Sequence, residues 1–159
     1  MPSTVIVNFM TLIHQNSNGM AMFFPDACKT PTPGGPIPIP YPNIAQGTMI
    51  SQGTTTVQAD KAAILVQDAQ FAMSSGDEAG SAGGGVVTNM IKGKAELVNF
   101  SFDVKADGKM VGRMLDPMIG NEMSSKPGNT PPSPELQAPL VAPPALPAMP
   151  GDWSISGAG

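Results

Sequence analysis

Two side chains of this sequence could serve metal binding or nucleophilic chemistry: Cys28 and His14, the single cysteine and the single histidine of its 159 residues. A closed zinc site normally takes four protein ligands, so carboxylates would have to supply the rest, and Asp26, Asp103 and Asp116 are the candidates. Catalysis by a cysteine–histidine pair would also need an orienting group and an oxyanion pocket, and the sequence identifies neither. The favoured interpretation is a small buried thiol and a histidine at the edge of a turn.

Asp77 and Glu78 are adjacent carboxylates followed by a glycine-rich segment. Neighbouring side chains in an extended segment diverge, so they do not form a general acid–base pair. We expect Asp77 to accept hydrogen bonds from the backbone amides of the loop that follows. The three glycines at 83–85 lack the lysine and the helix of a phosphate-binding loop, and we expect them to permit a tight bend.

Twelve methionines are many for this length, and the stretch from Met110 to Met123 contains four of them. Thioether sulfur atoms can bind cuprous ion, but methionine more often fills irregular space between apolar side chains. We therefore expect adaptable apolar filler in a narrow core that has few aromatic residues.

The composition limits the fold and the partners. Glycine and proline make up 36 of 159 residues and charged residues only 13%, which disfavours long amphipathic helices and favours an all-β, turn-rich domain. The formal charge of −4, without a basic cluster, argues against a nucleic-acid partner. The sequence shows neither a membrane-spanning apolar run nor a signal peptide, so we expect a soluble chain made in the cytoplasm.

Residues 24–44 contain seven prolines within eighteen positions. Each proline fixes its φ angle and removes an amide donor, so this segment is expected to form neither an ordinary helix nor a central strand. Ile37, Ile39 and Tyr41 alternate with the prolines, and this alternation predicts a rigid, extended and packed segment.

Turn signals divide most of the remaining sequence into hairpins. The expected strand pairs are residues 3–13 with 20–24, 47–58 with 63–66, and 86–90 with 95–104. Asp60-Lys61 is expected to supply the turn of the second pair. Asp107-Gly108 is a further turn signal that leads into residues 109–115, after which Pro117 and Gly120 are expected to break regular structure.

The expected domain covers residues 1–129 and is followed by a proline-rich tail, residues 130–159. Nine of the 24 residues from Pro127 to Pro150 are proline, which predicts polyproline-like extension or disorder. Trp153 is either an exposed tail residue or an aromatic anchor that docks on a partner.

Seven short motifs follow one another along the chain at residues 24–31, 36–43, 75–80, 84–87, 92–96, 102–105 and 113–116. In this order they resemble the PAAR-like proteins that tip the spikes of type VI secretion systems and related contractile injection machines. The resemblance covers about residues 20–132.

The resemblance implies a small conical β-domain whose base sits on the trimeric end of a VgrG-type spike, one tip per trimer, and whose point leads the strike. It implies a non-enzymatic protein that is assembled in the cytoplasm, is secreted with the spike and touches the target membrane transiently. Related members carry toxins fused to or docked on their termini. Because this sequence has no toxin-sized extension, an effector would be bound non-covalently, with the tail and Trp153 as the candidate holding segment.

One departure from the family concerns metal binding. Family members typically have a histidine after the arginine of the last motif and further histidines downstream, which together with the cysteine suggest a bound metal. This sequence has Met114 at the first position and Gly120, Asn121 and Met123 around the others. We therefore expect no family-type zinc site, although zinc remains an alternative, and we expect an apolar plug that involves Met114 and Met118.

Two other functions stay open from the sequence. One is a small secreted toxin or thiol-dependent hydrolase that uses Cys28 and His14. The other is a structural module stabilised by a metal.

Overall fold

The computed structural model describes residues 3–122 and 128–137, which form β-strands and one 3-10 turn, η1 (Gly47–Met49). The strands are β1 (Ile6–Val7), β2 (Met10–Thr11), β3 (Gly19–Thr30), β4 (Ile37–Gln46), β5 (Ile50–Ser51), β6 (Gln58–Ala59), β7 (Ala62–Ala63), β8 (Gln70–Phe71), β9 (Ser74–Ser75), β10 (Gly84–Gly85), β11 (Lys94–Leu97), β12 (Lys105–Ala106), β13 (Lys109–Met110), β14 (Pro117–Glu122) and β15 (Ser133–Gln137). The prediction of an all-β fold is confirmed. Within these residues no helix has the length and hydrophobicity needed to cross a membrane.

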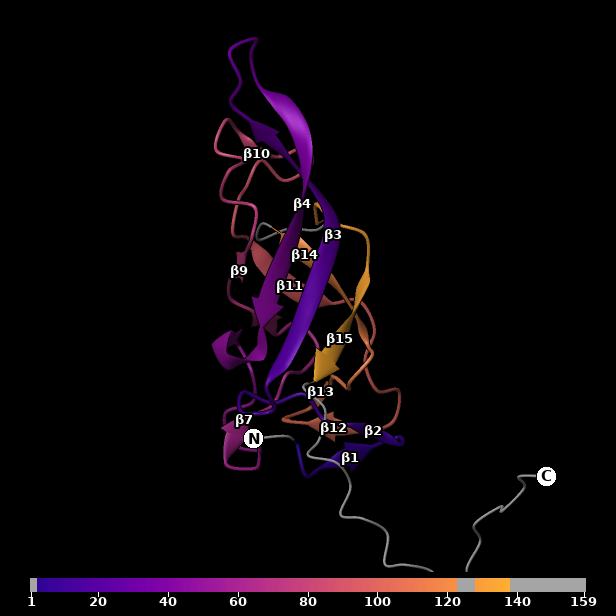
Figure 1. The fold of residues 1–159 in the computed structure, drawn as a ribbon. Coiled ribbons are helices and arrows are strands. Elements are labelled where there is room, and N and C mark those ends of the chain that lie inside the picture. The colour runs from indigo at the N-terminus through magenta and orange to yellow at the C-terminus, as the bar shows by residue number, and fades with distance from the viewer. Residues whose placement is uncertain (1–2, 123–127, 138–159) are drawn as a thin grey trace, which may run out of the picture.

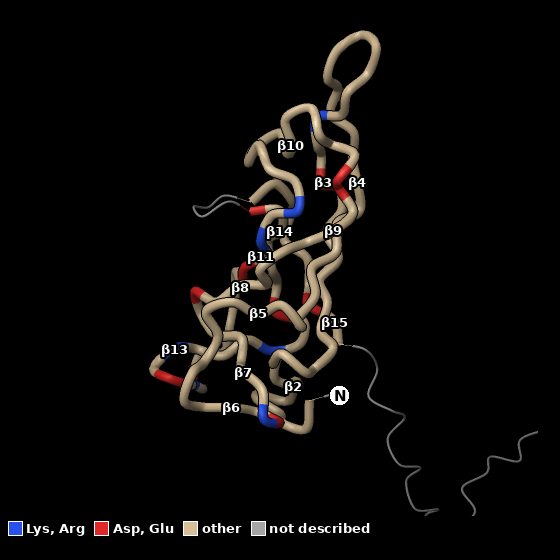
Figure 2. The backbone as a smooth tube through the Cα atoms, turned by 90° about the vertical axis from the view of Figure 1, so that its left-hand side faces the viewer, with Lys and Arg blue, Asp and Glu red and all other residues tan. Residues whose placement is uncertain are grey.

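One large antiparallel sheet joins most of the strands, in the order β5-β8-β11-β14-β15-β3-β4-β9, with β10 added beside β3. β3 and β4 run along the molecule to a loop at one end, and the short strands β1, β2, β7, β12 and β13 lie at the opposite end (Figure 1). A view turned by 90° shows the same separation (Figure 2). We call the part around residues 31–36 the loop end, and the part built by β1, β2, β6, β7, β12 and β13 the hairpin end.

The proline-rich segment forms most of a long hairpin between β3 and β4. The prolines of β4 lie where only β3 pairs with it, because β9 pairs with β4 at Ile44 and Ala45 alone. An edge position tolerates proline because one side of the strand needs no amide donors. The expected extended and ordered segment is therefore a strand, and over its prolines it is an edge strand.

β3, unlike the proline-containing part of β4, is paired on both sides. It has β4 on one side and β15 or β10 on the other, yet it runs through Pro25. The pairing register with β4 shifts between Phe23 and Asp26, and this irregularity accommodates the missing donor. The expectation that no central strand passes through residues 24–44 is therefore wrong for β3.

Two predicted turns are confirmed. Asp60-Lys61 connects β6 to β7 and Asp107-Gly108 connects β12 to β13, and all four residues have positive φ angles. Such angles are those of the tight turns that match the twist of a two-stranded hairpin.

Other expected hairpins are wrong. Residues 3–13 do not form one strand, because β1 and β2 already pair with each other through a turn at Asn8-Phe9. β11 pairs with β8 and β14, not with a strand at 86–90. Pro117 and Gly120 do not end regular structure but lie in β14, which is flanked by β11 and β15, with Pro117 at the first strand position.

The described domain continues past residue 129. β15 pairs with β14 and with the start of β3, although residues 133–137 fall in the predicted tail. The rest of that tail, including Trp153, lies outside the described residues.

The core is narrow and mostly aliphatic. Its largest fully buried members are Phe23, Phe71, Ile13, Leu65 and Met118. Met118 fills the core as predicted, whereas other methionines, such as Met20 and Met22 on β3, have exposed side chains.

Candidate functional site

Three short hairpins at the hairpin end repeat one another: β1–β2, β6–β7 and β12–β13. The turn of each begins with Asn8, Asp60 or Asp107, and each of these residues adopts a left-handed conformation. A short sequence pattern accompanies them, because residues 5–8, 57–60 and 104–107 each read valine, any residue, valine or alanine, and then asparagine or aspartate. This weak internal repeat was the signal that could have revealed the arrangement.

Backbone hydrogen bonds close the three repeats into a ring. The amide of Ile13 donates to the carbonyl of Gly112 (3.1 Å), that of Gly112 to Leu65 (2.8 Å), and that of Leu65 to Ile13 (2.9 Å). Isolated bridges between neighbouring segments lie beside these bonds, at Leu12 with Arg113, His14 with Ile64, and Val66 with Val111. Each segment therefore contacts both others, as around a threefold axis.

Side chains repeat the same cyclic pattern. The carboxylate of Asp60 accepts from the amide of Thr4 (2.8 Å) and from its hydroxyl, and that of Asp107 accepts from the amide of Thr56 (3.0 Å) and from its hydroxyl. Hydrogen bonds from Thr56 and its neighbours lower the pKa of Asp107 to about 2.

Asn8 completes this side-chain cycle by donating to Asp103, at 3.0 Å. Each turn residue thus binds the segment that leads into the preceding hairpin, and the cycle ties the three repeats together independently of the backbone ring.

His14 and Arg113 are structural parts of the hairpin end. The buried imidazole of His14 accepts from the amide of Asn16 (3.2 Å) through Nδ1, and its Nε2 lies 3.0 Å from Asp60. Burial lowers its pKa, against the opposing effect of Asp60. Arg113 forms a buried ion pair with Asp116 at 3.0 Å.

An apolar corner marks one repeat of the ring. Phe9, at the β1–β2 turn, is fully exposed, and Ile6 and Phe102 are 68% and 77% exposed. Asn8 bonds to Ser101 and Asp103, so the segments that carry Phe9 and Phe102 are adjacent. We call Ile6, Phe9 and Phe102 the apolar corner. The turn positions equivalent to Phe9 hold Lys61 and Gly108.

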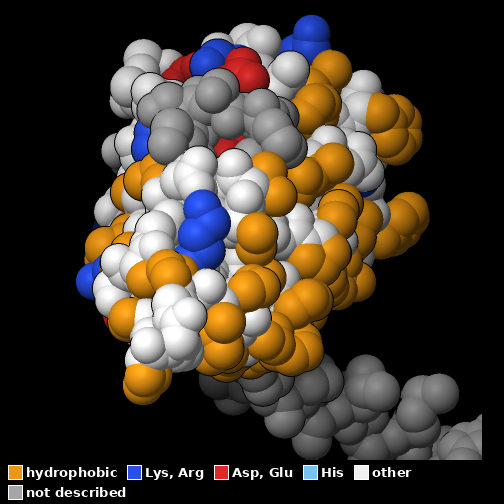
Figure 3. Space-filling model, turned by 90° about the horizontal axis from the view of Figure 1, so that it is seen from above, with side chains coloured by type: hydrophobic (Ala, Val, Ile, Leu, Met, Phe, Trp, Pro, Cys, Tyr) orange, Lys and Arg blue, Asp and Glu red, His pale blue; other side chains and the backbone are white. Residues whose placement is uncertain are grey.

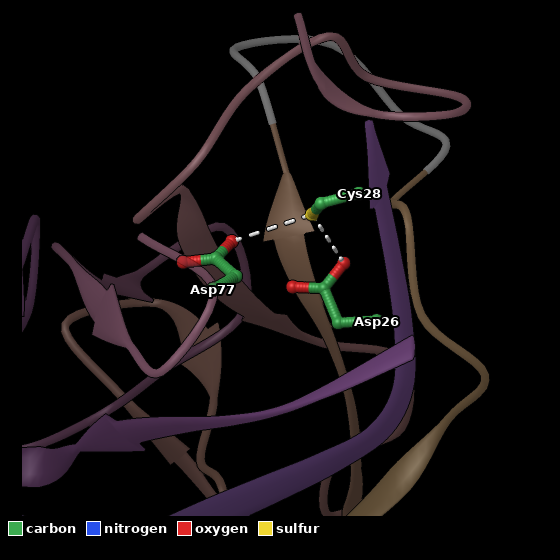
Figure 4. A group of neighbouring side chains, drawn as sticks. All are labelled: Asp26, Cys28 and Asp77. Carbon is green, nitrogen blue, oxygen red and sulfur yellow. Dashed lines mark hydrogen bonds between the residues drawn. The ribbon is translucent and has the colours of Figure 1, made fainter. Parts of the chain in front are cut away.

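A second cluster surrounds Cys28, well away from the hairpin end. The Cys28 thiol lies 3.6 Å from Asp26 and 3.9 Å from Asp77, and all three side chains are buried (Figure 4). Burial and the two carboxyl groups raise the pKa of Cys28 to about 12. Burial raises the pKa of Asp77 to about 6, although amide donation from Lys92 acts in the opposite sense.

The structure brings together only some of the predicted residues. Cys28 pairs with β10 and His14 with the segment after β7, and these strands lie at opposite ends of the molecule (Figures 1 and 2). Of the candidate carboxylates, Asp26 lies beside Cys28, whereas Asp103 and Asp116 belong to the hairpin end.

The sequence gives no sign that Asp77 lies beside Cys28. Its carboxylate accepts from the amide of Lys92 (3.0 and 3.2 Å), beyond the glycine-rich loop that it was expected to cap. The expected tight bend is present, with positive φ angles at Gly83 and Gly84.

Met114 and Met118, the predicted plug, are placed by the structure at separate positions. Met118 belongs to the main core, whereas Met114 is half-buried and donates its amide to Thr11 at the hairpin end. The side chains within hydrogen-bonding range of Cys28 are polar: Asp26, Asp77 and Asn121.

The buried position of Glu135 is also not visible in the sequence. This residue lies on β15 with a fully buried carboxyl group whose two oxygens have no hydrogen-bond partner among the described residues. Burial, followed by the charge of Asp116, raises its pKa to about 8. A buried charged residue has no signal in a single sequence, because glutamate is normally exposed.

Comparisons with known proteins identify the family of this chain. Residues 19–127 match the family model described as the toxin PAAR-like domain, and this chain belongs to that family. It is also 36% identical over 148 residues to the DNase toxin Tse7 of Pseudomonas aeruginosa, covering 89% of this chain. The chain spans only 38% of the length of that relative. No solved structure matches it significantly.

Proposed function

We propose that this chain is a spike-tip protein that caps the threefold end of a VgrG-type trimer, one copy per trimer, in a type VI secretion system or a related machine. The single observation that carries the proposal is the closed ring formed by Ile13, Leu65 and Gly112 with its three hairpins. One chain with three similar lobes can meet three identical subunits in similar ways, whereas an ordinary asymmetric surface would meet each of them differently. The hairpin end is then the base, and the loop end leads.

The loop end suits the leading position. Residues 31–36 carry no charge, and Ile37, Val86 and Val87 are exposed there. Seen from this end, hydrophobic side chains cover much of the surface and charged ones are few (Figure 3). Such a surface enters an apolar layer at lower cost than a charged one, which supports transient contact with a target membrane. Secretion together with the spike is part of the same proposal.

The apolar corner supplies the most direct test. Exposed aromatic side chains are frequent hot spots of protein interfaces. We expect Phe9→Glu and Phe102→Glu to weaken binding to the cognate spike trimer at least tenfold in calorimetry, whereas Ile37→Glu at the loop end should bind as the wild type does.

Native mass spectrometry of the wild-type mixture should give one copy of this chain with three spike subunits. A reproducible lack of association, or equal loss of binding in all three variants, would reject the proposed base.

The proposed role is not enzymatic. The Tse7 relative is named a DNase toxin, but this chain corresponds to less than half of its length, so we propose that the shared part serves delivery. An effector held through the tail and Trp153 is part of this proposal. Purified chain should leave plasmid DNA intact with added magnesium, and cleavage abolished by a point substitution in this chain would contradict a purely structural role.

The hydrolase alternative gains no support from the geometry, because Cys28 and His14 belong to opposite ends of the molecule. A thiol with a pKa of about 12 is also a poor nucleophile near neutral pH.

A further inference from the structure

The resemblance to PAAR-like proteins implies a metal beside Cys28, and the surroundings of Cys28 test whether one fits. Three asparagine amides converge on Asp26. The Nδ2 atoms of Asn43 and Asn121 donate to it at 2.8 and 3.2 Å, and that of Asn129 donates as well. Asp26 is fully buried, so these amides replace its hydration.

The orientation of two of these amides is fixed by the backbone around them. Asn121 accepts from the amide of Gly93 (3.0 Å) through Oδ1 and donates to the carbonyl of Met90 (2.8 Å) through Nδ2. A flipped side chain would lose both bonds. The second Nδ2 hydrogen therefore faces Asp26 and Cys28.

Asn129 is fixed in the same way. It accepts from the amide of Val87 (2.9 Å) through Oδ1 and donates to the carbonyl of Ala27 (3.0 Å) through Nδ2. Amide hydrogens cannot ligate a cation, which needs lone pairs, and the chain's single histidine lies at the hairpin end. Among the described residues, Asp26, Cys28 and Asp77 lie close enough together to offer three ligand atoms, one fewer than a closed zinc site takes, so the residues present do not fit the metal of the family.

We propose that the carboxylate of Asp26, held by the amides of Asn43, Asn121 and Asn129, occupies the structural role of the family's metal, so that this part of the molecule is held together without a metal ion. We call Asp26 and its three asparagines the amide clamp.

The amide clamp connects segments that are distant in sequence. Asp26 lies on β3, Asn43 on β4 and Asn121 on β14, and Asn129 follows the undescribed residues 123–127. Charge-assisted hydrogen bonds are about twice as strong as neutral ones, so a single carboxylate can hold these segments rigidly. The molecule then keeps its shape independently of zinc supply.

Metal content provides the first test, with untagged protein from zinc-supplemented medium, purified without chelator. We expect less than about 0.1 zinc per chain by elemental analysis, and a melting temperature that changes by less than about 1 °C with EDTA. Stoichiometric zinc, or a large EDTA-induced fall in melting temperature, would overturn the proposal whatever the variants do.

Two isosteric variants provide the second test. Asp26→Asn removes the charge at the centre of the clamp and should lower the melting temperature by about 5–10 °C, or prevent folding. Cys28→Ser keeps a small side chain at the edge of the clamp and should change it by no more than about 3 °C. In a metal site the cysteine would be a main ligand, so a greater loss in Cys28→Ser than in Asp26→Asn, accompanied by loss of bound zinc, would contradict the amide clamp.

Discussion

The buried carboxyl group of Glu135 should make the stability of this protein fall as pH rises. Its pKa is about 8 in the folded chain, against an ordinary value of 4.5, because burial disfavours the charged form and Asp116 repels it. A raised carboxyl pKa means that the stabilising contribution of the neutral form is fully present below about pH 4.5 and is lost as pH rises to about 8. Glu135→Gln removes this dependence, because glutamine has nearly the same shape and never ionises.

The size of the effect follows from the two pKa values. The interval from 4.5 to about 8, at about 1.36 kcal/mol per pH unit, gives an upper limit of about 5 kcal/mol. Relaxation of the surroundings and entry of water reduce such values, and we expect roughly 2–3 kcal/mol. The loss of free energy of unfolding between pH 5 and pH 9 should therefore be smaller by roughly this amount in Glu135→Gln than in the wild type.

Urea unfolding at pH 5 and pH 9 measures this difference directly. The comparison between the two pH values cancels any constant cost of placing an amide in the site. Glu78→Gln, a change at an exposed glutamate, is the matched control and should follow the wild-type profile. Profiles of wild type and Glu135→Gln that run parallel to within about 0.5 kcal/mol would show that Glu135 is not buried as a neutral acid.

Two further predictions concern packing and reactivity. Gly120→Ala should lower the free energy of unfolding by about 2 kcal/mol or more, because the new Cβ would lie 2.3 Å from the buried ring of Phe23, whereas Gly34→Ala, with open space around it, should be neutral in the same urea titration. Equal stability of the two variants would contradict the packing of β14 on β3. Cys28 is fully buried with a raised pKa, so iodoacetamide at pH 8 should label the folded chain at least 100-fold more slowly than the urea-unfolded chain. Mass spectrometry measures the labelling rate, and fast labelling of the folded chain would place the thiol at the surface.

Local chemistry in the sequence predicts the local parts of this fold. The turns at Asp60-Lys61 and Asp107-Gly108 are visible because their residue types favour positive φ angles whatever surrounds them. The ordered, extended nature of the proline-rich segment follows from the fixed φ of proline and from the alternation of apolar residues. These properties need no knowledge of distant partners.

Long-range pairing is what a single sequence leaves open. Pro117 indicates a break, but β11 and β15 flank the segment that follows it and make it a central strand. β15 looks like proline-rich tail until its pairing with β3 is known. In both cases strands from far along the chain override local preference.

The candidate sites were hidden for similar reasons. The amide clamp joins Asp26 to asparagines up to 103 residues away, and asparagine carries little signal of its own. The threefold ring depends on three hairpins whose sequences share only short patterns. The methionines suggested an apolar plug because the sequence could not show which side chains surround Cys28.

The orientation of this chain on its partner tests the central claim most directly, and a density map of the assembled spike would reveal it. The account predicts one copy per trimer, with the hairpins β1–β2, β6–β7 and β12–β13 against the three subunits and the β3–β4 loop pointing away. A map in which the loop end faces the trimer, or in which three copies surround its flank, would contradict it.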